Sequence, residues 1–340
     1  MNQQELASIA QAIVAKNKGI LAADESTSTI GKRFNSIHIE STEEHRRLYR
    51  ELLFTAPGSS EFISGVILYD ETIRQKTKDG TPFPAYLKKQ GVLPGIKVDT
   101  GAKPLSGFPG ETITEGLDGL RERLAQYHGL GARFAKWRAV IDIGTGIPTR
   151  YAIDANAAAL ARYASLCQEA GIVPIVEPEV LMDGAHTIER CEEVTDAVLE
   201  SVFAHLAAAR IYLEGIILKP NMVIPGKKSG QKVAPEQVAE ATLRCLKRHV
   251  PSAVPGIAFL SGGQGPVEAT LHLSLLNALG KAPWKLTFSY GRALQEDALS
   301  TWAGKADAFG SAQQAFYKRA KLNGLAAEGA YKSTMESAAA

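Results

Sequence analysis

The sequence is poor in cysteine and has no long uncharged hydrophobic run. Only three of its 340 residues are cysteines, Cys167, Cys191 and Cys245, and no two of them form a CxxC pair. Widely spaced cysteines in odd number are typical of a chain kept reduced in the cytoplasm, where they serve as small buried hydrophobic groups. No apolar segment reaches the roughly 18 residues of a membrane-spanning helix. The start, MNQQELASIAQAIVAKNKG, lacks the cationic and apolar parts of a signal peptide, so we expect none.

The chain also has little net charge, +2 in total, which is too small to indicate a nucleic acid or an anionic membrane as partner. A hydrophobic fraction of 45% and a charged fraction of 22% are typical of a globular protein. No Pro/Gly/Ser-rich linker divides the chain. We therefore predict one domain over residues 1–340, with an amphipathic surface helix at 1–18 that ends at Gly19 and a mobile C-terminal tail at 326–340.

Short apolar runs typical of strands recur along the chain, with helical patterns between several of them. One such pattern, ANAAALARYASLCQEAG, is rich in alanine and closes on Gly171. The predicted strands are GILAAD (19–24), FISGVILYD (62–70), LPGIKVD (93–99), ARFAKWRAVIDIG (132–144), IVPIVEPEV (172–180), GIILKPN (215–221), GIAFLSGG (256–263) and KLTFSYG (285–291).

Strand and helix alternating eight times predict an α/β fold, a (β/α)₈ TIM barrel with a C-terminal extension after the eighth strand. A doubly wound open sheet is the alternative architecture. The count of eight, and the absence of GxGxxG after the first strand, favour the barrel.

Charged side chains stand at the C-terminal ends of the predicted strands, where barrels of this type carry their active sites. Alternate residues of a strand share a face, so cations and carboxylates converge if those faces point inward. Converging charges form either an ionic plug or an active site, and their number at one end favours the second. These residues are Asp24 on the first strand, Lys97 and Asp99 on the third, Lys136 and Arg138 on the fourth, Glu177 and Glu179 on the fifth, and Lys219 on the sixth.

Glycines follow the seventh and eighth predicted strands, in SGGQG (261–265) and SYGR (289–292). Glycine lets backbone amides approach an oxyanion, and an arginine fork binds phosphate. One glycine turn often only redirects the chain, but two beside each other, after strands 7 and 8, indicate a phosphate site. Its candidate residues are Ser261, Gly262, Gly263, Ser289, Gly291 and Arg292.

Lys219 follows a buried apolar run and precedes Pro220, which cannot continue a central strand. Burial and the neighbouring Lys136 and Lys97 both disfavour its ammonium form, so we expect a neutral amine. Such an amine attacks a ketone to give an iminium, which is an electron sink. The alternative is a lysine that extends to the rim or pairs with Glu177.

A metal ion is the main alternative catalyst for cleavage of an aldol. The seven histidines form no HxxH or HExxH pair and stand at no predicted strand end, so we expect no zinc site. Asp24, Glu177 and Glu179 are suitable ligands for Mg²⁺, but the lysines among them disfavour a dication. We expect neither a metal nor a cofactor.

Seven motifs occur in order: LAADEST, GIKVD, AKWR, VPIVEPE, LKPNMV, FLSGGQ and LTFSYGRALQ. Together they resemble the class I (Schiff-base) fructose-bisphosphate aldolases, and the resemblance extends over nearly the whole chain, from Gly19 to about Tyr331. The resemblance implies a lyase with a (β/α)₈ barrel, assembled as a homotetramer. It also implies reversible cleavage of fructose 1,6-bisphosphate to dihydroxyacetone phosphate and glyceraldehyde 3-phosphate, in glycolysis and gluconeogenesis.

The resemblance also implies a role for each charged residue. Lys219 forms the Schiff base, and Asp24 takes the proton of the C4 hydroxyl as the C3–C4 bond breaks. Glu177, supported by Glu179, dehydrates the carbinolamine, while Lys136 stabilises charge beside the iminium. Arg138 orients this carboxylate–lysine group.

The resemblance also implies two sets of residues that bind the two phosphates of the substrate. The glycine turns named above bind the C1 phosphate. The residues that face the C6 phosphate are Ser26, Thr29 and Lys97, with Arg33 nearby.

Two features depart from the family pattern. Ser28 stands where the family has glycine, and it carries strain if that position needs positive φ. The chain ends in MESAAA, without the terminal tyrosine that assists protonation of the enamine, and Tyr331 lies before this tail. We therefore expect Glu177 to take over the proton transfer, or turnover to be limited there.

Two other functions stay open at this point. A transaldolase or a single-phosphate sugar aldolase also forms an iminium. If the substrate has only one phosphate, however, the cations Lys97 and Arg33 have no phosphate to bind. A non-catalytic scaffold is compatible with the barrel alone, since fold does not fix function. The presence together of Lys219, Glu177 and Asp24 argues against it.

Overall fold

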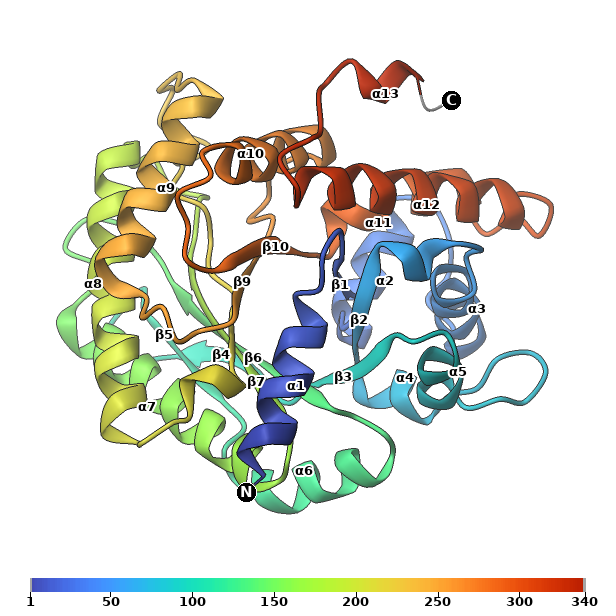
Figure 1. Ribbon diagram of the computed structural model, residues 1–340, viewed down its shortest axis with the longest axis horizontal. Coiled ribbons are helices and arrows are strands. Elements are labelled where there is room, and N and C mark those ends of the chain that lie inside the picture. Colours follow the sequence, from blue (N-terminus) through green and yellow to red (C-terminus); the bar gives the residue numbers. More distant parts are fainter. Residues whose placement is uncertain (1, 339–340) are drawn as a thin grey trace.

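The computed structural model describes residues 2–338 and confirms the predicted barrel. Parallel strands close in the order β1-β10-β9-β8-β7-β6-β3-β2, so the open doubly wound sheet is wrong. Figure 1 shows the strands at the centre with the helices around them. None of the described helices is long and apolar enough to cross a membrane.

Each barrel strand lies inside one of the predicted apolar runs. The runs extend further because their polar ends form the loops at the mouth of the barrel. The strands are β1 (Gly19–Ala22), β2 (Ile63–Leu68), β3 (Leu93–Lys97), β6 (Phe134–Ile141), β7 (Val173–Val180), β8 (Ile217–Leu218), β9 (Gly256–Phe259) and β10 (Lys285–Tyr290).

Helices follow the strands and cover the outside of the barrel. The alanine-rich pattern belongs to α7, after which Gly171 has φ of +71°. The helices are α2 (Thr27–Asn35), α3 (Glu43–Phe54), α4 (Asp70–Arg74), α5 (Phe83–Lys89), α6 (Leu120–Gly129), α7 (Arg150–Glu169), α8 (Ile188–Ala208), α9 (Pro235–His249), α10 (Pro266–Ala278), α11 (Arg292–Trp302), α12 (Phe309–Ala326) and α13 (Met335–Ala338), with short 3₁₀ turns at Ser59–Glu61 and Leu213–Gly215.

An antiparallel hairpin that the sequence did not predict follows β3. Its strands are β4 (Gly101–Pro104) and β5 (Thr112–Glu115), which pair with each other only. The segment is rich in Gly and Pro, which indicates loop rather than strand.

The N-terminal helix α1 (Gln3–Ile13) closes the base of the barrel. It ends at Ile13, not at Gly19, and it is more than a surface helix. Leu6, Ala10 and Ile13 are fully buried and form one cluster with residues that the strands point inward, such as Phe134 and Ile217. In Figure 1, α1 lies across the strands.

Side-chain alternation divides the barrel interior into an apolar base and a charged mouth. Along β6, Phe134 lies in the cluster that packs on α1, and Lys136, two residues on, faces the mouth. Ile217 in β8 and Lys219 just after it repeat this arrangement. The strands thus bury apolar surface at one end and deliver charges to the other.

The C-terminal segment is anchored beside α12. Tyr331 is buried and donates a hydrogen bond to Glu336 (2.8 Å). The same carboxylate accepts two bonds from Arg319, at 2.7 and 2.9 Å. Of the predicted tail, residues 339–340 lie outside the described residues, and its mobility stays a prediction.

Candidate active site

A cavity of about 1080 Å³ opens at the C-terminal ends of the strands, and every candidate site residue named from the sequence lines it. Four strands, β3, β6, β7 and β10, deliver one or two of these residues each, and the segments that follow β1, β8, β9 and β10 supply the rest. The cavity is therefore built where the fold predicts an active site.

Lys219 lies at the floor of the cavity, just past the short strand β8. Its side chain is about 5% exposed, and its Nζ is 3.2 Å from Glu177 Oε1. The position is fixed by its own N–H, which donates to the carbonyl of Val176 at 2.8 Å. The amine is thus held away from bulk water beside one carboxylate.

The carboxylate of Glu177 stands between two lysines. Oε1 faces Lys219, and Oε2 is 3.4 Å from Lys136 Nζ. Within the described part of the chain, Oε2 is buried and accepts no hydrogen bond. A buried acceptor without a hydrogen bond costs about 1–3 kcal/mol, and at Oε2 the ammonium of Lys136 offsets part of this cost.

Lys136 joins three carboxylates. Its Nζ lies 2.8 Å from Asp24 Oδ2 and 3.8 Å from Asp99 Oδ2, in addition to Glu177. Burial alone would lower the pKa of Lys136, but these carboxylates raise it well above its ordinary value. Burial alone would raise the pKa of Asp24, but Lys136 and Lys219 hold it well below its usual range. Asp24 is therefore ionised and Lys136 is charged at neutral pH.

Two further ion pairs complete the charged mouth. Lys97 Nζ is 2.6 Å from Asp99 Oδ1, and Arg138 pairs with Glu179. Burial alone would lower the pKa of Arg138, but Glu179 raises it well above its ordinary value. The groups are paired, as an ionic plug requires, and they face an open cavity, as an active site requires.

The predicted phosphate turns lie together at one side of the cavity. Gly262 and Gly263 have φ of +54° and +81°, which favours glycine at both positions. Arg292, at the start of α11, donates to the carbonyl of Gly263 at 2.9 Å. Ser289 Oγ is buried and has no hydrogen-bond partner in residues 2–337. A buried hydroxyl facing a cavity beside a helix N-terminus suits an anion.

The loop after β1 forms the neighbouring wall, because β1 pairs with β10 in the barrel. Ser26 caps α2, and its Oγ accepts from the N–H of Thr29 at 3.4 Å. Ser28 lies in the first turn of α2 and is not among the described residues of positive φ, so the expected strain does not arise. Its hydroxyl is 3.0 Å from that of Ser26, which adds a polar group to this wall.

Arg33 lies close to residues of both predicted phosphate sites. It pairs with Glu25, and its Nη2 is 3.6 Å from where a Cβ on Gly291 would lie. The guanidinium therefore lies near the turn after β10 as well as in the loop wall. The sequence had placed it near the C6 phosphate only.

A buried network beneath the first loop was missed from the sequence. Glu25 Oε2 lies 2.7 Å from Arg50, and Gln295 donates to Glu25 Oε1 (3.0 Å) and to the carbonyl of Ala22 (2.8 Å). Arg50 and Gln295 come from α3 and α11, and nothing in their local sequence indicates that they meet. The network fixes the end of β1 and hence the position of Asp24.

The family comparison agrees with this geometry. A family model described as fructose-bisphosphate aldolase class-I matches residues 5–340. The chain belongs to the class I fructose-bisphosphate aldolase family. This membership favours the fructose-bisphosphate aldolase over the transaldolase, the single-phosphate aldolase and the scaffold that the sequence left open.

Relatives of this aldolase family cover nearly the whole chain. The protein named "Probable fructose-bisphosphate aldolase class 1" of Xanthomonas axonopodis pv. citri is 60% identical over 333 residues, covering 98% of this chain and 100% of that protein. Fructose-bisphosphate aldolase 4, cytosolic, of Arabidopsis thaliana is 56% identical, covering 96% and 84%. The Plasmodium falciparum aldolase, solved with TRAP and a small-molecule inhibitor, superposes with a TM-score of 0.96 at 50% identity, covering 97% and 96%.

Class I aldolases are lyases that work without a metal ion. Among residues 2–338, no three His, Cys, Asp or Glu side chains come together as a candidate metal site. The carboxylates considered for Mg²⁺ are engaged by cations, Asp24 by Lys136 and Glu179 by Arg138. The three cysteines are free and buried, and burial raises the pKa of each thiol.

Proposed function

We propose that this chain cleaves fructose 1,6-bisphosphate reversibly to dihydroxyacetone phosphate and glyceraldehyde 3-phosphate through a Schiff base on Lys219, in glycolysis and gluconeogenesis. The observation that carries the proposal is the buried amine of Lys219 beside Glu177, on the floor of a cavity with anion-binding groups on two walls. A sugar with a phosphate at each end requires both walls.

The first steps belong to Lys219 and Glu177. Glu177 first takes a proton from the ammonium of Lys219. The freed amine attacks the C2 carbonyl carbon, and the proton that the nitrogen then loses passes to the carbonyl oxygen to give a carbinolamine. Glu177 then donates a proton to the hydroxyl, which leaves as water, and the nitrogen lone pair forms the iminium. The 3.2 Å separation of Lys219 Nζ from Glu177 Oε1 supports this transfer.

The carbon–carbon bond is broken with Asp24 as base. The lowered pKa of Asp24 keeps it ionised, so it can accept the proton of the C4 hydroxyl. The electrons of the C3–C4 bond move to the iminium and give an enamine, and glyceraldehyde 3-phosphate leaves as the aldehyde. Lys136, 2.8 Å from Asp24, holds that carboxylate and offsets charge beside the nitrogen.

The enamine must then gain a proton at C3 before hydrolysis frees Lys219. Tyr331 does not line the cavity, and its hydroxyl donates to Glu336. Glu177 lies beside Lys219 and has a free oxygen, so we assign this proton transfer to it.

The phosphates would be divided between the two walls. The turn at Gly262 and Gly263, with Ser289 and Arg292, receives the phosphate on C1. The loop of Ser26 and Thr29, together with Lys97, receives the phosphate on C6. Arg33, which lies between the two walls, is in reach of either one.

Reduction with borohydride in the presence of dihydroxyacetone phosphate tests the mechanism. We expect a permanent adduct, seen by intact mass and mapped to Lys219, and none in Lys219→Arg because arginine stays protonated. Activity should survive EDTA. Exchange of the C3 proton of dihydroxyacetone phosphate should be lost in Glu177→Gln, whose adduct also forms slowly. An adduct on another lysine, or full activity in Lys219→Arg, would overturn the proposal.

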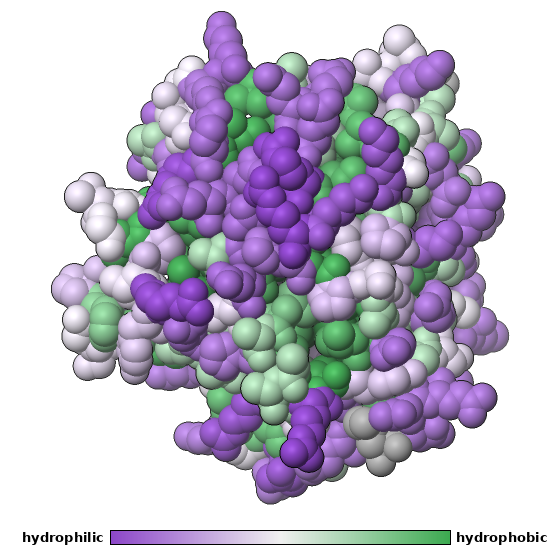
Figure 2. Space-filling view, turned by 60° about the vertical axis from the view of Figure 1, so that its left-hand side comes forward, coloured by the Kyte–Doolittle hydropathy of each residue, from purple (hydrophilic) through white to green (hydrophobic). Residues whose placement is uncertain are grey.

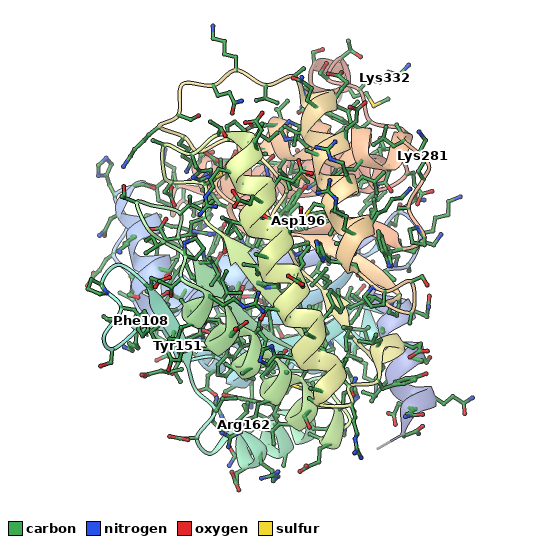
Figure 3. The ribbon with its side chains drawn as sticks, turned by 90° about the vertical axis from the view of Figure 1, so that its left-hand side faces the viewer. Phe108, Tyr151, Arg162, Asp196, Lys281 and Lys332 are labelled. Atoms are coloured by element: carbon green, nitrogen blue, oxygen red, sulfur yellow. The ribbon has the colours of Figure 1, made fainter. Side chains whose placement is uncertain are left out.

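We also propose a cytoplasmic homotetramer. The cytosolic Arabidopsis relative and the free, buried cysteines support the compartment. An exposed aromatic pair supports an interface: Tyr151 is 56% exposed and stacks on Phe108, with ring centroids 4.6 Å apart. Figure 3 shows the two side chains beside each other at the edge of the molecule.

A further inference from the structure

Two loops at the mouth of the barrel are joined beside the phosphate turn. One follows β7 and the other follows β8. The N–H groups of Gly226, Lys227 and Lys228 donate to three carbonyls of the first loop, at 2.9, 2.7 and 3.0 Å. The second loop is thereby held in a fixed position, with Lys227 at its centre.

The side chain of Lys227 reaches the phosphate turn. A Cβ built on Gly263 would lie 2.5 Å from Lys227 Nζ and 3.1 Å from its Cε. The ammonium group is therefore in contact with the backbone of Gly263, a lining residue of the cavity. The positive φ of Gly263 favours glycine at this position, and the missing side chain leaves room for the ammonium group.

The charge around the turn is unbalanced. Arg292 donates a hydrogen bond to the carbonyl of Gly263. The ammonium group of Lys227 lies close to the Cα of the same residue. Lys227 Nζ has one carboxylate nearby, that of Asp183 at 3.3 Å, and both side chains of this pair are exposed, 44% and 66%. An exposed pair of this kind contributes little and exchanges partners easily. Ser289, whose Oγ is buried and without a described partner, lines the same cavity.

We propose that Lys227 is a phosphate-recognition residue of this aldolase, and the proposal rests on the function proposed above. Its ammonium leaves Asp183 and binds the phosphate on C1, which is doubly charged and so a stronger partner than a carboxylate. When substrate is absent, Lys227 Nζ lies 3.3 Å from Asp183 in this weak, exposed pair. Lys227 thus selects phosphorylated over neutral ketones without touching the reacting carbon.

The test compares two ketones by borohydride trapping on Lys219. We expect Lys227→Ala to raise the half-saturating concentration of dihydroxyacetone phosphate about three- to tenfold, as for loss of a partly exposed charged hydrogen bond. Unphosphorylated dihydroxyacetone should trap as in the wild type. Lys227→Arg should restore most of the affinity, and the defect should shrink as salt rises from about 0.05 to about 0.5 M.

Lys228→Ala is the matched control, because Lys228 is exposed on the same loop and only its backbone joins the first loop. It should behave as the wild type with both ketones. Asp183→Asn should lower the half-saturating concentration of dihydroxyacetone phosphate, because the competing carboxylate is removed.

Equal half-saturation in Lys227→Ala and the wild type would overturn the assignment, as would an equal loss with the neutral ketone. Both outcomes leave the Schiff-base function intact, since the wild type still traps. A wild type that forms no adduct on Lys219 with either ketone would instead refute the proposed function.

Discussion

Lys136 is the residue on which the charge balance of the mouth depends. It contacts Asp24, Asp99 and Glu177, and the last of these also faces Lys219. A buried ammonium is tolerated only with such partners, because burial penalises an unpaired charge.

The Asp24–Lys136 pair should give the fold a pH-dependent stability. Because the pKa of Asp24 is lowered in the folded chain, its carboxylate stabilises the fold above the unfolded pKa of about 4. That contribution is lost as the pH falls from there toward the lower, folded pKa. We expect Asp24→Asn to reduce the free energy of unfolding by about 3 kcal/mol between pH 5 and 8, and the difference to shrink below pH 4.

Denaturant unfolding at a series of pH values measures this difference. Glu115→Gln, at an exposed position of β5, is the control and should show no such dependence. A difference between wild type and Asp24→Asn that grows below pH 4 would contradict the assignment.

At the scale of elements, the barrel strands were predictable and some of the other parts were not. A strand buried on both faces is a continuous apolar run, and eight such runs separated by helical patterns leave few architectures. The hairpin β4–β5 was not predictable because it carries no such run. The base-closing role of α1 depends on the whole barrel, and its own pattern indicates only one apolar face.

Some residues of the site were likewise predictable from the sequence, and others were not. Residues such as Lys136 and Glu177 are predictable because strand alternation places them on the inner face at the mouth. The network joins Glu25, in the loop after β1, to Arg50 and Gln295 on two helices, and Glu25 and Gln295 are 270 residues apart in the sequence. Lys227 lies in a loop without periodicity, so only the fold brings it to Gly263.

Closure of the barrel by α1 should matter for stability and not for chemistry. Leu6 is fully buried beneath the strands, at the opposite end from the cavity. We expect Leu6→Ala to lower the free energy of unfolding by about 3 kcal/mol, since it leaves a cavity in a packed core. The turnover number at 25 °C should stay within twofold of the wild type.

Chemical unfolding and steady-state kinetics on the same preparations decide the matter. Gln4→Ala, on the exposed face of α1, should change neither quantity. A large loss of turnover in Leu6→Ala, with stability unchanged, would show that α1 acts on the mouth.

At the scale of the whole molecule, polar side chains dominate the visible surface. Figure 2 shows hydrophilic residues over much of one face, with hydrophobic residues in smaller patches between them. Tyr151, Val267 and Leu130 are the exposed large hydrophobic residues of the described chain, and Tyr151 is the most exposed of them. Exposed aromatic side chains are enriched at interfaces between subunits.

The proposed tetramer gives a direct prediction. Sedimentation equilibrium should yield about four times the 36.4 kDa mass of the chain. Tyr151→Ser should weaken the assembly, because the stacked pair with Phe108 would lose its exposed ring. Leu130→Ser, which changes an isolated exposed side chain, is the matched control. A monomer mass for the wild type would refute the tetramer, and an unchanged Tyr151→Ser would remove Tyr151 from the interface.

The position of α1 beneath the strands also has a practical consequence. A tether joined to the N-terminal end of the chain would attach on the side away from the cavity mouth. Enzyme fixed to a bead or an electrode through that end would therefore present its openings to the surrounding solution. Linkage through lysine side chains, in contrast, would also modify the amines on which catalysis is proposed to depend.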